Sequence, residues 1–458
     1  MDGGRHGIGV IGTVAQRFFD DDALASQMNR GAYTGGLDGW TFLDAGRTWV
    51  VAGWAGGSLV TGEPDRLTAL QRGAVHYFQR PDASHVEVDS AATTLAGWAG
   101  RVTLNKQKGN VLFNAGLGMI APGFELNDLG FQGRADLIAT HAVAGYRWTR
   151  PTSLYQRLTI NNAVFAAWDF GGNNTALGVG HLGNVLWNGF WRTRWRVFAS
   201  PQTTNVRLTR GGPAMLNMPG VELALGMNSD DRKRFTFGVD GYVNRFAQAA
   251  DRSYGLETWV EWKPTTQLAL GLGPGYFRNL DGAQYVQTAG DPLATATYGA
   301  RYVFGDLDQH TVSANIRLNW IFTPRLSLEL FVQPLVSSGQ YTQLKELRAP
   351  RTFDFVRYGI DDGSTWDREN GIVDPDGAGP AAPIVVGDPD FTFTSLRGNA
   401  VLRWEWVPGS TFFLVWAHNR ANSSPVGRFA PGQSFDELLA VPADNILMAK
   451  VSWWWNPS

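Results

Sequence analysis

The feature that most constrains this chain is a period of two in its apolar residues. Only an extended strand sends successive side chains to opposite faces, so this period predicts a sheet with one apolar and one polar face. The alternation is clearest in residues 311–322 and recurs in 326–336, 396–406 and 447–455. In 311–322 the apolar set is Val312, Ala314, Ile316, Leu318, Trp320 and Phe322, and the polar set is Thr311, Ser313, Asn315, Arg317 and Asn319.

Composition places the apolar face in a lipid bilayer. Charged residues are only 17% of the chain, below the roughly 25% of a usual soluble domain. The chain holds 19 Trp, 26 Phe, 12 Tyr and 55 Gly, as expected for transmembrane strands with aromatic girdles. No apolar run is long enough for a membrane helix, since the most apolar stretch, 111–124, is broken by Asn114 and by glycines.

Charge and cysteine content exclude several functions. The net charge is -2 and no basic stripe is present, so nucleic acid is not an expected partner. The chain has no cysteine. Disulfides, thiolate metal sites and cysteine nucleophiles are therefore excluded.

The connections between the predicted strands are of two lengths. Bacterial barrels alternate short periplasmic turns with long extracellular loops, so we expect the two kinds to lie at opposite rims. The short turns are 228–231, 263–266, 323–325 and 407–410, and the long segments are 62–92, 121–130, 200–219, 338–389 and 421–444.

Counting back from the aromatic C-terminal end, Trp453 to Trp455, gives the topology. Alternation holds along the chain if 284–288 is a short strand, a tight turn lies near Arg192, and 67–79 holds a short helix. The sequence therefore predicts one all-β domain, 1–458, a transmembrane antiparallel up-and-down β-barrel of about 20 strands (18–22) in the bacterial outer membrane. Both termini are expected in the periplasm, and loop insertions are expected at about 62–92, 200–219, 338–389 and 421–444.

The first ten residues, MDGGRHGIGV, have no basic segment followed by an apolar core and so contain no signal peptide. Because a barrel reaches the outer membrane only by export, we expect the chain to be a mature or truncated part of a longer precursor.

Several longer motifs resemble a known family. They are HYFQRPDA (76–83), PGFELNDLGF (122–131), RGGP (210–213), FTPRLSLELFVQP (322–334) and NAVLRWEWVPGSTFFLVW (399–416). In this order, and over nearly the whole chain, they resemble the bacterial outer-membrane proteins of unknown function in which a family 9 carbohydrate-binding-like module usually precedes a C-terminal barrel domain. The resemblance implies the barrel. The module is absent from these residues, so the resemblance assigns no glycan site to them.

No catalytic constellation emerges from the sequence. The seven histidines, His6, His76, His85, His141, His181, His310 and His418, are scattered without metal-ligand spacing. The one nucleophilic arrangement worth considering joins His418 with Asn419 and Ser452, but no motif such as GxSxG supports it. We therefore predict no catalytic residue, no enzymatic activity and no cofactor.

An acidic loop, 361–390, offers the only candidate for a metal. Asp374 and Asp376 precede Gly377 and resemble part of a calcium-binding loop. The spacing and the closing glutamate of an EF-hand are missing, and a solvated acidic loop is the alternative.

Two sets of residues are candidates for a pore. The RGGP segment, Arg210, Gly211, Gly212 and Pro213, lies in a long loop that either folds inward as a constriction, with Arg210 anchored to lumen carboxylates, or forms a surface turn. The polar faces of the strands provide candidate lumen-lining charges, which either tune selectivity or form cross-strand ion pairs. These are Arg317, Glu329, Arg397, Arg403 and Glu405.

Three functions follow in order of preference. The first is a porin-like or transport channel for small solutes or saccharides. The second is a structural anchor for a carbohydrate-binding periplasmic or surface module, and the third is an outer-membrane hydrolase. The expected partners are outer-membrane lipid, the barrel assembly machinery and a possible saccharide.

Overall fold

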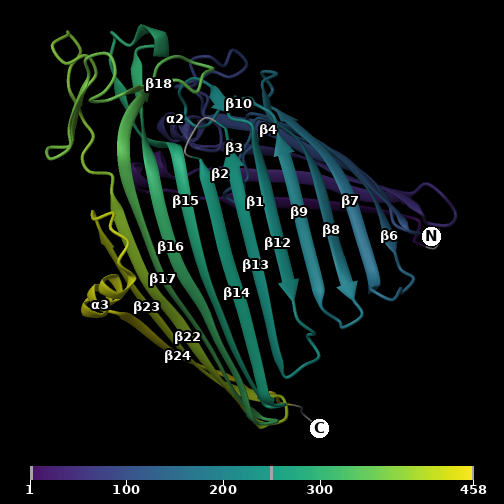
Figure 1. Ribbon diagram of the computed structural model, residues 1–458. Helices are drawn as coiled ribbons and strands as arrows, with labels where there is room; N and C mark the ends of the chain where they lie inside the picture. Colours follow the sequence, from purple (N-terminus) through teal and green to yellow (C-terminus); the bar gives the residue numbers. More distant parts are fainter. Residues whose placement is uncertain (1–3, 248–250, 456–458) are drawn as a thin grey trace.

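A computed structural model describes residues 4–247 and 251–455. Eighteen strands within these residues form one antiparallel meander in which each strand pairs with the next. Figure 1 shows the meander as one strongly curved sheet, with α2, β10 and β18 near one rim and both chain ends at the other. The strands are β1 (His6–Gln16), β2 (Gly31–Phe42), β3 (Trp49–Thr61), β4 (Thr94–Lys106), β5 (Val111–Ile120), β6 (Leu137–Trp148), β7 (Tyr155–Trp168), β8 (Asn174–Trp187), β9 (Arg192–Ser200), β12 (Gly220–Asn228), β13 (Phe235–Phe246), β14 (Arg252–Thr265), β15 (Leu268–Gly290), β16 (Ala300–Thr323), β17 (Leu326–Leu347), β22 (Phe391–Val407), β23 (Ser410–Ser424) and β24 (Asp444–Ser452).

The remaining elements lie in the connections at one rim. No helix in the described ranges is long and apolar enough to span a membrane. These elements are α1 (Asp22–Gln27), α2 (Pro64–Arg72), α3 (Pro431–Ala440), the 3-10 helix η1 (Thr295–Thr297), β10 (Thr203–Asn205), β11 (Met215–Asn217), β18 (Phe355–Arg357), β19 (Thr365–Asp367), β20 (Ile372–Asp374) and β21 (Ile384–Val385).

The alternation of short and long connections is confirmed. Connections such as 266–267, 324–325 and 408–409 lie at one rim, which we call the turn rim. The long connections lie at the opposite rim, the loop rim, and are most extended at 62–93 and 348–390. The helix expected within 67–79 is present as α2, although it begins and ends earlier.

Strand register confirms the two faces of the sheet. The ladders from β16 to β23 place residues of one parity side by side, so that Leu318, Leu330 and Leu402 share the apolar face. On the other face many aromatic rings lie over glycines of the next strand. The ring of Trp259, for example, covers Gly271 and Gly273 so closely that a Cβ at either glycine would overlap it. Glycine is therefore required there for the aromatic ring to lie flat.

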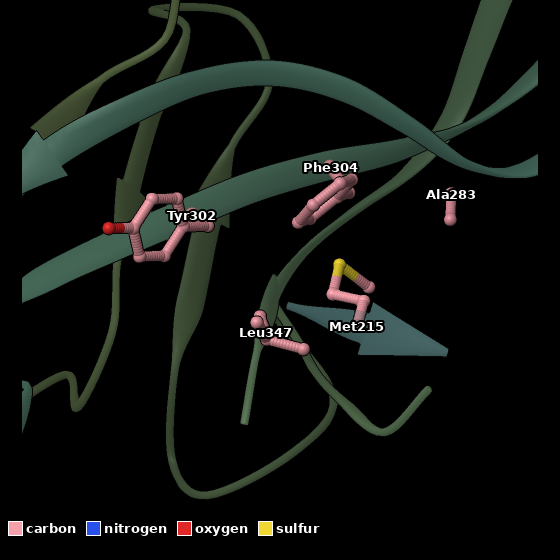
Figure 2. Packing of buried hydrophobic residues seen from close by; sticks show 5 residues of the cluster. All are labelled: Met215, Ala283, Tyr302, Phe304 and Leu347. Atoms are coloured by element: carbon pink, nitrogen blue, oxygen red, sulfur yellow. The ribbon is translucent and has the colours of Figure 1, made fainter. Parts of the chain in front are cut away.

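The loops fold over this second face, which makes it the inner one. A cavity of about 290 Å³ lies between the β10–β11 hairpin and the face that carries Phe165, Phe246 and Asp281. At the same rim Met215 of β11 packs against Tyr302 and Phe304 of β16 in a buried hydrophobic cluster, together with Ala283 and Leu347 (Figure 2).

Two details of the expected topology are wrong, whereas the number of strands lies within the expected range of 18–22. Residues 284–288 are not a separate strand but the end of β15, and the meander has eighteen strands, the lower limit of the expected range. The loop expected from 338 begins only at 348, since β17 continues to Leu347 and its end is buried under the loops. The boundary was misplaced because a strand can continue beyond the membrane where other loops cover it. The alternation of apolar and polar residues does not show where the bilayer ends.

The expected closed barrel is not seen. Within 4–247 and 251–455 no ladder joins β1 to β24, and the nine residues of β24 are all exposed. Both strands run antiparallel to each other, as the even number requires, so closure is compatible with the topology. The alternation of apolar and polar residues predicts which face of the sheet each residue occupies, but it does not predict which strand pairs with β1 or β24.

Candidate functional site

A network of buried polar side chains joins loops 62–93 and 121–136. His76 is completely buried, and its two ring nitrogens lie 2.9 Å from a carboxylate oxygen of Glu125 and 2.7 Å from the carbonyl oxygen of Pro122. Burial opposes the ionisation of Glu125, but hydrogen bonds from His76 and from the amide of Asn127 outweigh it and hold the pKa of this carboxyl below its usual range. The contact between His76 and Glu125 therefore holds the two loops together.

A second network adds loop 169–173. The guanidinium of Arg80 lies 3.5 Å from Asp136 and 3.4 Å from Asp169, and all three side chains are at most 10% exposed. His85 lies 2.9 Å from Asp136. Because buried carboxylates need a countercharge, Arg80 is the group that makes this junction stable.

The centre of these loops has an excess of positive charge. Arg207, from loop 201–219, donates to the carbonyl of Ala74 and lies over the ring of Tyr77, with 5.0 Å from its guanidinium carbon to the ring centre. Burial lowers the pKa of Arg134, and the nearby charge of Arg207 lowers it further. Arg80, Arg134 and Arg207 thus lie near enough to one another and to Asp136 for their charges to interact, and of the three only Arg80 forms an ion pair with Asp136 and Asp169 among the described residues.

The loop at 348–390 joins the same assembly. Arg351 donates to the side chain of Asn173 at 2.9 Å, and its backbone amide donates to the carbonyl of Ala214. Asp82 accepts a hydrogen bond from the amide of Ala214. We call loops 62–93, 121–136, 169–173, 201–219 and 348–390 together the loop cluster. Its contacts connect strands from distant parts of the meander, so the sheet curls far enough to bring them together.

The inner face below the loop cluster carries a groove of about 570 Å³. Its floor is the backbone of small residues such as Gly226 and Gly255. Arg194 reaches across Gly226 to Asp240, with a separation of 2.6 Å. Beside this pair lie Arg196, Tyr242, Glu257 and Phe277, and the rings of Tyr242 and Phe277 stack at 28° with 6.2 Å between their centres. The groove thus presents charged groups, hydrogen-bonding groups and aromatic rings on the inner face of the sheet.

Comparison with known families assigns the chain. The model of the family described as "Domain of unknown function (DUF5916)" matches residues 68–456. The chain belongs to this family. This agrees with the family of unknown function expected from the motifs, and both HYFQRPDA and PGFELNDLGF lie in the loop cluster of this DUF5916 chain. No curated protein matches it.

The solved structures similar to the DUF5916 chain include siderophore receptors and an outer-membrane secretin. A mutant of the ferric enterobactin receptor of Pseudomonas aeruginosa is 6% identical with a TM-score of 0.46, over 97% of this chain and 71% of the other. The siderophore receptor PirA of Acinetobacter baumannii is 9% identical with a TM-score of 0.45, over 97% and 73%. A bacterial polysaccharide outer membrane secretin is 10% identical with a TM-score of 0.30, over 72% and 87%.

In the RGGP segment of the DUF5916 chain Gly211, Gly212 and Pro213 are buried inside the loop cluster, whereas Arg210 is exposed. Arg210 and Gly211 both have positive φ, 51° and 101°. A Cβ at Gly211 would overlap the side chain of Gln79, and one at Gly212 would overlap the ring of Tyr302. The guanidinium carbon of Arg210 lies 4.7 Å from the ring centre of Tyr285 and forms no ion pair with a described residue. The expected carboxylate anchor is therefore replaced by an aromatic one.

The five candidate lumen charges share the inner face, but they form few contacts with one another. Register places Arg317 opposite Phe331, Glu329 opposite Asn319, Arg397 opposite Gln333, and Arg403 opposite Ser327, with Glu405 on the same face of β22. Among the described residues the five form one ion pair, Arg403 to Glu405 at 3.1 Å, within a single strand. Cross-strand bracing is not how they are arranged, and a role in selectivity stays a prediction.

The structure does not bring the hypothetical catalytic residues together. His418 contacts Asn445 at 3.0 Å. Ser452 pairs with Thr411, seven residues away along β23, on the opposite face of the sheet from His418. At about 3.3 Å per residue this separation is far beyond hydrogen-bonding reach.

One group in the described ranges has the spacing of a metal site, and it is not the predicted one. His85, Asp136 and Asp169 offer ligand atoms within 4.8 Å of one another. However, the Arg80 guanidinium already pairs with both carboxylates, so these residues fit an ion-pair network better than a metal site. Asp374 and Asp376 mainly cap their own loop by accepting from backbone amides, and calcium binding there stays a prediction.

The residues that organise the loop cluster were not singled out from the sequence. His76, Arg80 and Glu125 lie in two of the motifs that carried the family resemblance. The available signal was the presence of charged residues within these two long-loop motifs.

Proposed function

We propose that this chain is a channel of the bacterial outer membrane for small polar solutes, and that the loop cluster is its gate. The observation that carries the proposal is the packing of five loops against one another at one rim, above an inner face lined with polar groups. Barrels of 16 to 18 strands are wide enough for an aqueous channel. In this proposal the loop rim faces the outside and both termini face the periplasm.

The five loops together hold 18 Asp and Glu but only 10 Arg, so it is the local charge at the centre of the loop cluster that supports a preference for anionic solutes. Three arginines at its centre outnumber the two nearby carboxylates. A positive potential at a narrow entrance raises the local concentration of anions and disfavours cations. Neutral saccharides would be recognised instead on the inner wall, where the rings of Tyr242 and Phe277 lie beside hydrogen-bonding charges.

Single-channel conductance in planar bilayers tests the gate. The chain has no cysteine, so a pair introduced as Asp82→Cys and Ala214→Cys can be cross-linked with a short thiol-specific linker. We expect steady openings before cross-linking, loss of conductance after it, and recovery when the linker is cleaved. The matched control is Arg192→Cys with Asp231→Cys, an exposed ion pair of 2.9 Å at the turn rim, where cross-linking should leave conductance unchanged.

Two results would reject the gate. Equal conductance of the cross-linked and free loop-rim variant would show that solutes do not pass the loop cluster. Silence of every variant, including one that lacks residues 211–217, would favour the alternative of a closed anchor for another module. Reversal potentials under a salt gradient measure the expected anion preference.

A further inference from the structure

A second groove, of about 1090 Å³, lies on the opposite, apolar side of the sheet near the loop rim. It follows one row of residues that are directly paired across six strands, from β7 to β14. The row begins with small apolar side chains and ends with two arginines. It consists of Val164, Val179, Ala199, Val221, Arg245 and Arg252.

The two arginines form an unusual pair. Arg245 and Arg252 are direct cross-strand neighbours at the ends of β13 and β14, and both are exposed. Neither has a side-chain hydrogen bond or an ion pair with any residue in the described ranges. Like charges directly opposite each other destabilise a sheet, so an anion between the guanidinium groups would remove an unfavourable interaction.

The apolar part of the groove faces the region where lipid chains lie. Val164 and Val179 are more than half exposed, although they are apolar. Strands of transmembrane barrels are tilted by about 35–45°, so a row across the strands also runs partly along the membrane normal. One end of the groove can therefore lie at head-group depth while the other lies among acyl chains.

We propose that this groove binds a membrane lipid that carries a phosphate monoester, with the phosphate between Arg245 and Arg252 and an acyl chain along Val221, Ala199 and Val179. Planar guanidinium groups match phosphate oxygens with paired hydrogen bonds. Basic residues at the membrane boundary are a general means of binding anionic head groups. The site lies on the outer face, so the proposal is independent of conductance through the lumen.

Native mass spectrometry of the full chain in detergent micelles tests the proposal, with dimyristoyl phosphatidic acid as the probe. We expect R245Q/R252Q to bind the probe about ten-fold more weakly, the effect of losing charge-assisted hydrogen bonds. The matched control is R147Q/R150Q, which removes two exposed positive charges at the turn rim and should leave affinity unchanged. Heat-modifiable migration on gels verifies that each variant is folded.

Two further measurements separate the head group from the chain. A199W fills the middle of the groove without touching the arginines, and we expect it to weaken the probe while it leaves the fold intact. Dimyristoyl phosphatidylcholine, whose phosphate is a diester, should bind more weakly than the probe.

Three results would overturn the proposal. They are equal affinity of R245Q/R252Q and the unaltered chain, equal affinity for the two lipids, and displacement of the probe by inorganic phosphate as effectively as by lipid. The last would assign the arginines to free phosphate.

Discussion

The loop cluster and the turn rim use the same charged side chains for different purposes. In the loop cluster Arg80 lies between Asp136 and Asp169, residues from two other loops, and is almost fully buried. At the turn rim Arg232 pairs with Asp230, two positions away in the same turn, and remains more than half exposed. The first contact holds distant segments together, whereas the second shapes one turn.

The difference shows where ion pairs stabilise this molecule and where they do not. Exposed ion pairs contribute little because water screens them, and the turn rim needs little because its connections, of two to six residues, already hold neighbouring strands together. A buried arginine cannot be removed without leaving carboxylates unpaired in a region of low polarity. The loop rim is therefore built like the interior of a soluble protein, and the turn rim like a surface.

The largest difference between the two rims is expected on removal of Arg80. In R80Q the carboxylates of Asp136 and Asp169 lose their countercharge, which we expect to destabilise the loop cluster by about 3–5 kcal/mol. Limited proteolysis should then cleave within 62–93 while the sheet stays intact on gels. The control is R232Q, for which we expect no new cleavage. Equal protection of R80Q and the unaltered chain would show that packing alone holds the loops.

Acid should open the same loops to a smaller extent. The pKa of Glu125 is below its usual range, so the pair with His76 contributes stability above the ordinary carboxyl range and loses it as the pH falls below that range. A hydrogen bond to a charged group is worth about 1.5–3 kcal/mol, and hydrogen exchange of 121–136 should quicken accordingly. In E125Q this pH dependence should be absent. A persistent dependence would assign it to another group.

The smallest effect is expected at the turn rim. The hydrogen bond from the Arg232 side chain lowers the pKa of Asp230 to about 2. Its stabilising effect is therefore present above the ordinary value of 3.8 and is lost as the pH falls toward 2. We expect D230N to leave thermal stability unchanged within error. An NMR titration should find the pKa of Asp230 raised in R232Q, and an unchanged pKa would rule out Arg232 as its cause.

Much of the sheet could be predicted, because each strand carries its own pattern. Val312 to Phe322 alternate whatever their neighbours are, and the register confirms the face of each. The loop cluster could not be predicted in this way. The contact of Arg80 with Asp169 depends on how the sheet curls, and no local period reports that. The absence of a ladder between β1 and β24 in the described ranges likewise depends on the whole sheet.

The hydrogen bond between Arg351 and Asn173 has a consequence for the order of folding. Its two residues are 178 positions apart in the chain, and Asp82 and Ala214 are 132 apart. Such distant contacts form late, because the entropy of closing a long chain segment must be overcome first. In contrast, hairpins of the sheet that are joined at the turn rim form by closing only a short turn. A newly made molecule should therefore pass through a stage in which the sheet is formed and the loops are not yet packed, so that the loop cluster is the last part to fold.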